Sequence, residues 1–357
     1  MSRHTGDGEM QPRAVFVLVL VICSALGASA SAACNVWRVP RAVPVDAVSG
    51  ILDAFRSHQI VALGEGLHGN EQGHALRLAL VRDPRFPTLV NDIVVEFGNS
   101  RYQDVMDQFV AGDEVPYDLL RRIWQDTINP NPLFDSPIYE GFFRAVREVN
   151  GSLPPSRHIR VLLGGAPVEW EKVRTREDLG RWKRGAEEVI SADVVSRNRR
   201  ALVIFGDGHF RRHNEWQQDP DGTFWPTLTQ RIERAASTRV FSIWTNTTVE
   251  LERIQRDVSS WPVPSLAILR GTRLGSVNFF YYAGLKSTLR MEDQYDALVY
   301  LGPVSSITIS ELSPSLCRDT SYMQMRLARM ALIAPAAPDA AMLERFCAAQ
   351  AQSQSGR

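Results

Sequence analysis

The chain has 357 residues, of which 44% are hydrophobic and 22% are charged, and this ordinary globular composition can bury a large core. Its 40 basic and 40 acidic residues give a formal net charge of zero, so the charge does not indicate a nucleic acid or an anionic membrane as partner. We therefore expect a small-molecule substrate or a peptide as the ligand.

The first 33 residues are typical of an export signal. Basic residues flank the start of an apolar run over residues 14–28, and small residues follow it. We expect residues 1–33 to be removed, the mature protein to be periplasmic or secreted, and no stable membrane span to remain. A retained membrane anchor is one alternative. Lipid attachment at Cys34 is another, although Ser31 stands where a lipobox has a Leu-like residue.

Signal cleavage would remove Cys23 and leave Cys34, Cys317 and Cys347. In an oxidising compartment we expect one disulfide and one odd thiol. A bond between Cys317 and Cys347 would staple a helical C-terminal region. Cys34 paired with either of them is the alternative, and the spacing does not decide between the two.

The first half of the chain alternates helices with short apolar strands. An amphipathic pattern predicts a helix over 45–58, and the apolar run 59–63 predicts a strand that ends in a glycine-rich turn. Asn70 is then a suitable N-cap for a helix that runs to about Arg82. A second apolar run ends at Glu96. Further elements are expected as helices over 101–109, 115–124 and 138–149 and as a strand over 160–163, with a proline-rich, ligand-facing loop over 125–137.

The second half begins with a charged, helical stretch over 169–199, which is expected to be a crossover helix pair or a cap over the site. The strand after it, 201–205, ends in Gly-Asp-Gly-His, and the polar loop 211–225 is a candidate lid. More strands are expected over 240–244, 265–269 and 297–301, and helices over 322–333 and 340–349. We assign 34–333 to a single α/β domain and 334–357 to a C-terminal helix and disordered tail.

Strands that alternate with helices at this spacing predict a mostly parallel, doubly wound sheet covered on both faces. In such sheets ligands bind beyond the carboxyl ends of the strands. Three of the expected strands end there in polar side chains, namely Glu65 with His68, Glu96, and Asp207 with His209.

Two histidines and several carboxylates that converge in this way suit general acid–base chemistry on water. The sequence has no Gly-x-Ser-x-Gly motif, so a serine nucleophile is not expected, and nothing supports a cysteine nucleophile. The same groups could hold a divalent metal, although no His-Glu-x-x-His motif is present. His74 and His213 are interpreted as surface residues.

The pattern Gly64-Glu65-x-x-His68-Gly69, with an arginine nine residues after the histidine, resembles the erythromycin esterase-like superfamily. A strand ending in Glu96 and a later strand followed by Gly208-His209 extend the resemblance from about residue 59 to residue 210. This group also includes the haem-uptake protein of the ChaN type and, more distantly, the TIKI and TraB proteins.

We expect a site without a cofactor, and the resemblance implies a three-layer α/β/α sandwich and the roles of the site residues. In that site His68 acts as general base on water, Glu65 and Glu96 position it, and His209 completes the catalytic group. Arg77 would bind substrate or stabilise charge, and we place Asp207 with it among the substrate-binding residues.

The esterases usually carry Ala-His-Asn-x-His-like residues after the fourth strand, whereas this chain has Gly-Asp-Gly-His-Phe, so their substrate contacts do not carry over. We therefore expect an exported hydrolase of an ester or similar bond, with macrolide hydrolysis as one activity in its range. The alternative is a ChaN-like protein that binds haem or a divalent metal without turnover.

Overall fold

The structure of the protein is a computed structural model that describes residues 39–181, 185–215, 224–280 and 286–333, together with residues 343 and 347. The expected signal, most of the expected C-terminal helix and tail, and residues 216–223 of the expected lid lie outside these ranges. The fold described below is that of the unit formed by residues 40–357.

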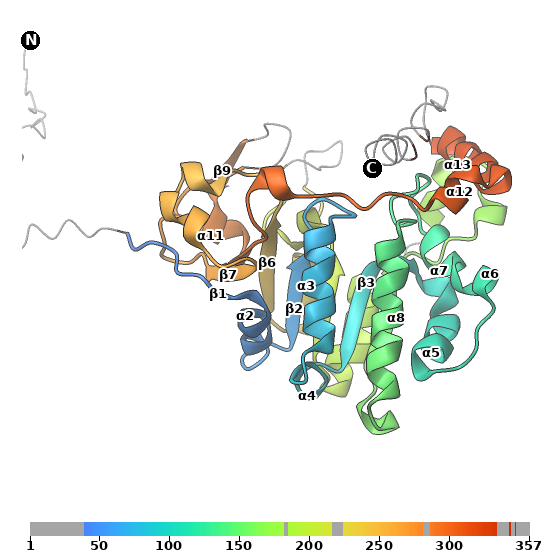
Figure 1. Cartoon of the computed structure of the whole chain (residues 1–357), viewed down its shortest axis with the longest axis horizontal. Helices are drawn as coiled ribbons and strands as arrows, with labels where there is room; N and C mark the ends of the chain where they lie inside the picture. The colour runs from blue at the N-terminus through green and yellow to red at the C-terminus, as the bar shows by residue number, and fades with distance from the viewer. Residues whose placement is uncertain are drawn as a thin grey trace, which may run out of the picture. The chain divides into compact units, whose positions relative to one another are not determined.

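An eight-stranded sheet in the order β1-β7-β10-β6-β2-β5-β3-β4 organises the described residues (Figure 1). The strands from β10 to β4 run parallel to one another, whereas β7 is antiparallel to both of its neighbours, β10 and β1, at one edge. The mostly parallel sheet expected from the sequence is therefore confirmed. The strands are β1 (Val45–Asp46), β2 (Ile60–Gly64), β3 (Asp92–Asn99), β4 (Arg160–Gly165), β5 (Ala201–Phe205), β6 (Val240–Asn246), β7 (Ser265–Ile268) and β10 (Ala297–Tyr300).

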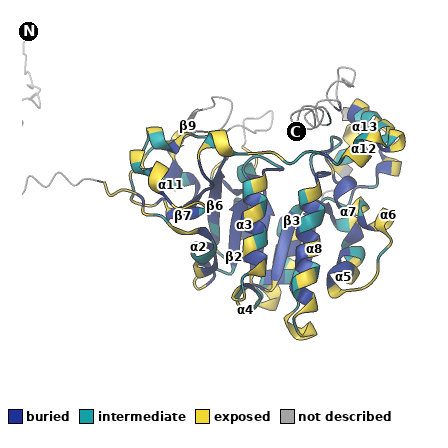
Figure 2. Ribbon diagram, in the orientation of Figure 1, coloured by how far each residue is buried: buried dark blue, intermediate teal, exposed yellow. Residues whose placement is uncertain are grey.

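Alternate residues of each central strand enter two separate hydrophobic cores. In β2, Val61 and Leu63 pack with the helices of one face, while Ile60 and Ala62 pack with those of the other. All four side chains are buried, as a strand covered on both faces requires (Figure 2). The result is a three-layer α/β/α sandwich.

Helices on both faces complete the sandwich. One core takes its helical residues from α2 (Ala47–Ala54), α3 (Glu71–Arg82), α4 (Phe86–Leu89), α5 (Gln103–Ala111), α6 (Tyr117–Leu120), α7 (Arg122–Gln125) and α8 (Pro137–Gly151). The other core takes them from α9 (Ala186–Val189), α10 (Leu228–Ala236) and α11 (Met291–Gln294). Outside these two cores lie α12 (Pro314–Arg318), α13 (Thr320–Ile333) and a small hairpin of β8 (Asn278–Phe280) and β9 (Lys286–Arg290).

The structure differs from the sequence-based expectation in several places. In the described residues of the charged stretch 169–199, short 3-10 turns precede one turn of α-helix, α9, which is followed by a π-helical turn. The expected helix over 115–124 is two short helices, α6 and α7. Strand β3 continues past Glu96 to Asn99, since Phe97 is completely buried among the aromatic rings of α8.

The C-terminal helices are tied to the loop that precedes α8. Arg326 of α13 is fully buried and donates two hydrogen bonds to Asp135, at 2.8 and 2.6 Å. A disulfide joins Cys317 to Cys347, which is the first of the two pairings that the sequence left open. None of the helices in the described ranges has the length and hydrophobicity that a membrane-spanning segment needs.

Candidate active site

The turn after β2 is held in one conformation by its own backbone and by Asn70. Gly66 and Gly69 have φ angles of 70° and 79°, which side chains other than glycine rarely adopt. Asn70 caps α3 by accepting the N–H of Gly73 at 2.6 Å, as expected, and its amide donates to the carbonyls of Glu65 and Leu67 at 2.6 Å. This turn therefore places Glu65 and His68 at the carboxyl edge of the sheet.

Glu65 lies between a cation and an imidazole. Its Oε2 is 2.8 Å from Nδ1 of His68, and its Oε1 is 2.9 Å from a guanidinium nitrogen of Arg77. Glu65 and Arg77 are 1% and 2% exposed, whereas a quarter of the His68 side chain is exposed. Arg77 thus contacts Glu65 and not solvent. Of the two roles that the resemblance implied for it, this position fits the stabilisation of charge better than direct binding of substrate.

The charges around His68 favour its protonated form. Burial alone would lower the pKa of the imidazole, but the hydrogen bond with Glu65 and the charges of Glu65, Glu96 and Asp207 outweigh it and raise the pKa to about 9. With Nδ1 occupied by Glu65, the other ring nitrogen, Nε2, is the one available to water or substrate.

Glu96 projects from β3 across the end of its neighbour β5. It accepts the backbone N–H of Gly206 at 2.7 Å, and its other oxygen is 3.3 Å from Nε2 of His209. Burial would raise the pKa of this carboxyl, but the contacts with His209, His68 and Gly206 hold it at about 2. Glu96 is therefore ionised at neutral pH.

Because Gly206 has no side chain, His68 and Glu96 can both lie close to it. A Cβ atom at this position would lie 3.1 Å from Nε2 of His68 and 3.6 Å from an oxygen of Glu96. Side-chain atoms from β2, β3 and the end of β5 thus converge at one place, as the sequence analysis expected. His209 is the most exposed of them, with 47% of its side chain accessible.

The carboxylate of Asp207 contacts the backbone around the turn after β2, unlike the other predicted site residues. Its carboxylate lies against Gly64, whose Cβ, if present, would overlap it, and it accepts the backbone N–H groups of Thr245, at 3.2 Å, and Gly66. Burial raises its pKa to about 7. These contacts support the turn after β2, so a role in binding substrate stays a prediction.

Comparison with known proteins supports the fold alone. The sequence matches no protein-family model, and no curated protein is similar enough to count as a relative. A solved structure of a Bacillus cereus protein matches 78% of this chain and 98% of its own, with 12% identity and a TM-score of 0.52. A structure named as a succinoglycan biosynthesis protein matches 76% of this chain and 96% of its own, with 9% identity and a TM-score of 0.53.

Two aromatic residues contribute to the site without having been singled out in the sequence. The ring of Phe134 packs edge-on against His68, with centroids 5.3 Å apart, and the hydroxyl of Tyr139 accepts the N–H of Gly69 at 2.9 Å. Both come from the segment that includes the proline-rich loop and the first turn of α8. The expectation that this loop faces the ligand was the one signal that pointed to them.

Proposed function

We propose that the protein is an exported hydrolase of the erythromycin esterase-like kind, which cleaves an ester or similar bond of a small molecule with water that His68 activates. One observation carries the proposal, namely the buried chain from Arg77 through Glu65 to Nδ1 of His68. It leaves Nε2 of a partly exposed imidazole as the proton acceptor, with a carboxylate to orient the ring.

In the proposed reaction, neutral His68 donates Nδ1–H to Glu65 and takes a proton from water at Nε2. The water oxygen forms a bond to the carbonyl carbon while the carbonyl π electrons move onto its oxygen. The imidazolium, stabilised by Glu65 and Glu96, then returns the proton to the leaving alcohol as the carbon–oxygen bond to it breaks. His209, exposed beside Glu96, is the group we expect to contact the substrate.

The raised pKa of His68 has a consequence for rate. At pH values below the His68 pKa of about 9, most of the imidazole is protonated and cannot accept a proton. The catalytic rate should therefore rise with pH and level off near that value. Glu96, with a pKa of about 2, stays ionised over this whole range.

A panel of chromogenic esters and macrolide lactones tests the proposal. His68→Ala should abolish turnover while the variant stays folded, as circular dichroism can check, although the loss of the ion pair with the buried Glu65 should lower its thermal stability at neutral pH. The matched control is His158→Ala, since His158 precedes β4 at the opposite edge of the sheet and bonds only a backbone carbonyl, at 3.1 Å. Turnover that survives in His68→Ala, or that is lost equally in the control, would contradict the proposal.

A second candidate function is metal binding without turnover. Glu65, His68 and Glu96 can each offer one ligand atom with all three atoms within 4.8 Å of one another, and these donor types suit zinc or manganese. The contacts that His68 and Arg77 make with Glu65 would then compete with the cation for the carboxylate. Tight zinc binding, lost in His68→Ala and accompanied by no ester turnover, would favour this candidate.

The haem alternative fits the described residues less well. Tyr102, one candidate axial ligand, is 7% exposed and donates its hydroxyl to Asp126 at 3.0 Å, so ligation would break a buried hydrogen bond. His209 is accessible but pairs with Glu96. A Soret band on haem titration that is lost in His209→Ala would revive this candidate.

A further inference from the structure

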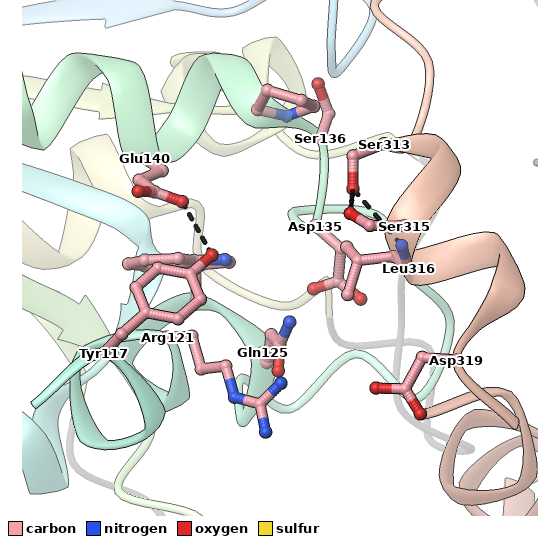
Figure 3. Close-up of a pocket in the computed structure, with 12 residues that line it drawn as sticks. Tyr117, Arg121, Gln125, Asp135, Ser136, Glu140, Ser313, Ser315, Leu316 and Asp319 are labelled. Carbon is pink, nitrogen blue, oxygen red and sulfur yellow. Dashed lines mark hydrogen bonds between the residues drawn. The ribbon is translucent and has the colours of Figure 1, made fainter. Parts of the chain in front are cut away.

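A cavity of about 430 Å³ lies on the side of α8 where the C-terminal helices pack (Figure 3). Its walls come from α6 and α7, from the loop that leads into α8, and from α12 and the residue after it. Neither His68 nor Glu96 lines it, so it is distinct from the candidate active site. Its volume is within the range of about 300–1,000 Å³ typical of small-molecule sites.

The walls of the cavity are fixed in place. Asp135, which lines it, is held by two hydrogen bonds from the buried Arg326 and by the hydroxyl of Tyr322. The wall formed by α12 is tied by the disulfide between Cys317 and Cys347. A preformed site of this kind does not need to order its own residues when a ligand binds.

For two polar side chains in the walls, no hydrogen-bond partner exists among the described residues. Gln125 is 6% exposed, and its amide makes no hydrogen bond with any described residue, while Figure 3 shows it near the middle of the cavity. Ser136 is 4% exposed, and its hydroxyl is also without a partner although it precedes α8, where a serine usually caps the helix. Because buried polar groups are normally hydrogen-bonded, the Ser136 hydroxyl indicates a polar ligand or water, and the Gln125 amide lines the same cavity.

The charges of the walls favour neither an anion nor a cation. Arg121 and Asp319 lie on opposite sides (Figure 3), and Arg121 also pairs with the exposed Asp118 at 3.1 Å. The carboxylates of Asp135 and Glu140 are balanced by arginines that lie outside the lining. We therefore expect a ligand that is neutral overall and offers both donors and acceptors.

The cavity also offers an aromatic face. The side chain of Tyr117 is among the exposed large hydrophobic residues, at 52%, and its hydroxyl donates to Glu140 at 3.0 Å. An aromatic ring beside hydroxyl, amide, guanidinium and carboxylate groups matches a sugar ring, which has an apolar face of C–H groups and an edge of hydroxyls. We propose that this cavity is a binding site for a neutral sugar ring, with Gln125 and Arg121 donating to its hydroxyls and Asp319 accepting from them.

Saturation-transfer NMR and calorimetry on the whole protein test the proposal. The probes are the methyl glycosides of glucose, galactose, mannose and N-acetylglucosamine, with glucuronic and galacturonic acid as charged counterparts. We expect at least one neutral glycoside to bind, and Arg121→Met and Gln125→Met each to weaken it about fivefold, as the loss of one hydrogen bond would. Arg82→Met, at an exposed arginine of α3 outside the cavity, is the control and should leave binding unchanged.

Three outcomes would overturn the proposal: no binding of any neutral glycoside at its highest soluble concentration, binding of the uronic acids alone, or binding that neither variant weakens. If Gln125→Met fails to fold because Gln125 is buried, Arg121→Met decides the question, since Arg121 is at the surface.

Discussion

Replacing Glu65 by Gln should lower the pKa of His68 far more than any other single change at the site. The substitution keeps the shape of the side chain but removes the hydrogen-bonding carboxylate and its charge, which together provide the strongest influences that raise this pKa. Burial, which lowers it, remains. We therefore expect the pKa in Glu65→Gln to fall to the ordinary histidine value of about 6.5 or below.

The size of this change follows from the wild-type shift. A rise from 6.5 to about 9 corresponds to about 3 kcal/mol of preference for the charged imidazole. The site therefore loses on the order of 3 kcal/mol of this preference when the carboxylate is removed. Glu96→Gln should lower the pKa too, but by less, because Glu96 acts on His68 through its charge alone.

The assay is an NMR titration of the His68 ring resonances, which needs no substrate. Glu148→Gln, at an exposed position on α8, is the matched control and should leave the titration unchanged. A wild-type pKa near 6.5, or a Glu65→Gln variant that still titrates near 9, would refute the account of the site's electrostatics.

Three further predictions concern the site, the C-terminal region and the mature chain. Gly206→Ala should reduce turnover about tenfold with little loss of thermal stability, since the added Cβ would lie 3.1 Å from Nε2 of His68, and unchanged kinetics would contradict this. Cys317→Ser should lower the free energy of unfolding, measured by urea denaturation, by about 3–4 kcal/mol, which is the chain-entropy value for a sequence separation of 30. A peptide map that shows a disulfide from Cys34 would count against the pairing. Mass analysis of protein from the native envelope should find a mature chain that begins between Ser31 and Cys34, and a chain that begins at Met1 would disprove the export signal.

The sequence alone could predict the central strands and the edge of the sheet at which their polar residues gather. Runs such as 201–205 are continuously apolar because both faces of a parallel sheet are covered, and the polar residues that follow them must then lie at one edge. Asn70 and the extent of α3 were equally predictable, since an N-cap and a helical pattern are local signals.

Other features of the site depend on contacts between distant parts of the chain, which local patterns do not show. The pattern did not show that Arg77 pairs with Glu65, because a charged residue on a helix is usually solvated. The contact of Phe134 with His68 follows from the buried pair of Asp135 and Arg326, which are 191 residues apart. The helix α10 was not predicted at all, although it carries a capping box, at Thr227 and Gln230, that local analysis could have found.

The measurement that tests the central claim most directly is the pH dependence of kcat/KM for a hydrolysed ester, compared between wild type and His68→Ala. If His68 is the general base, the wild-type rate should rise about tenfold per pH unit and level off near pH 9, and the variant should lack this rise. A profile that is flat, or that falls as pH increases toward 9, would show that His68 does not take the proton from water.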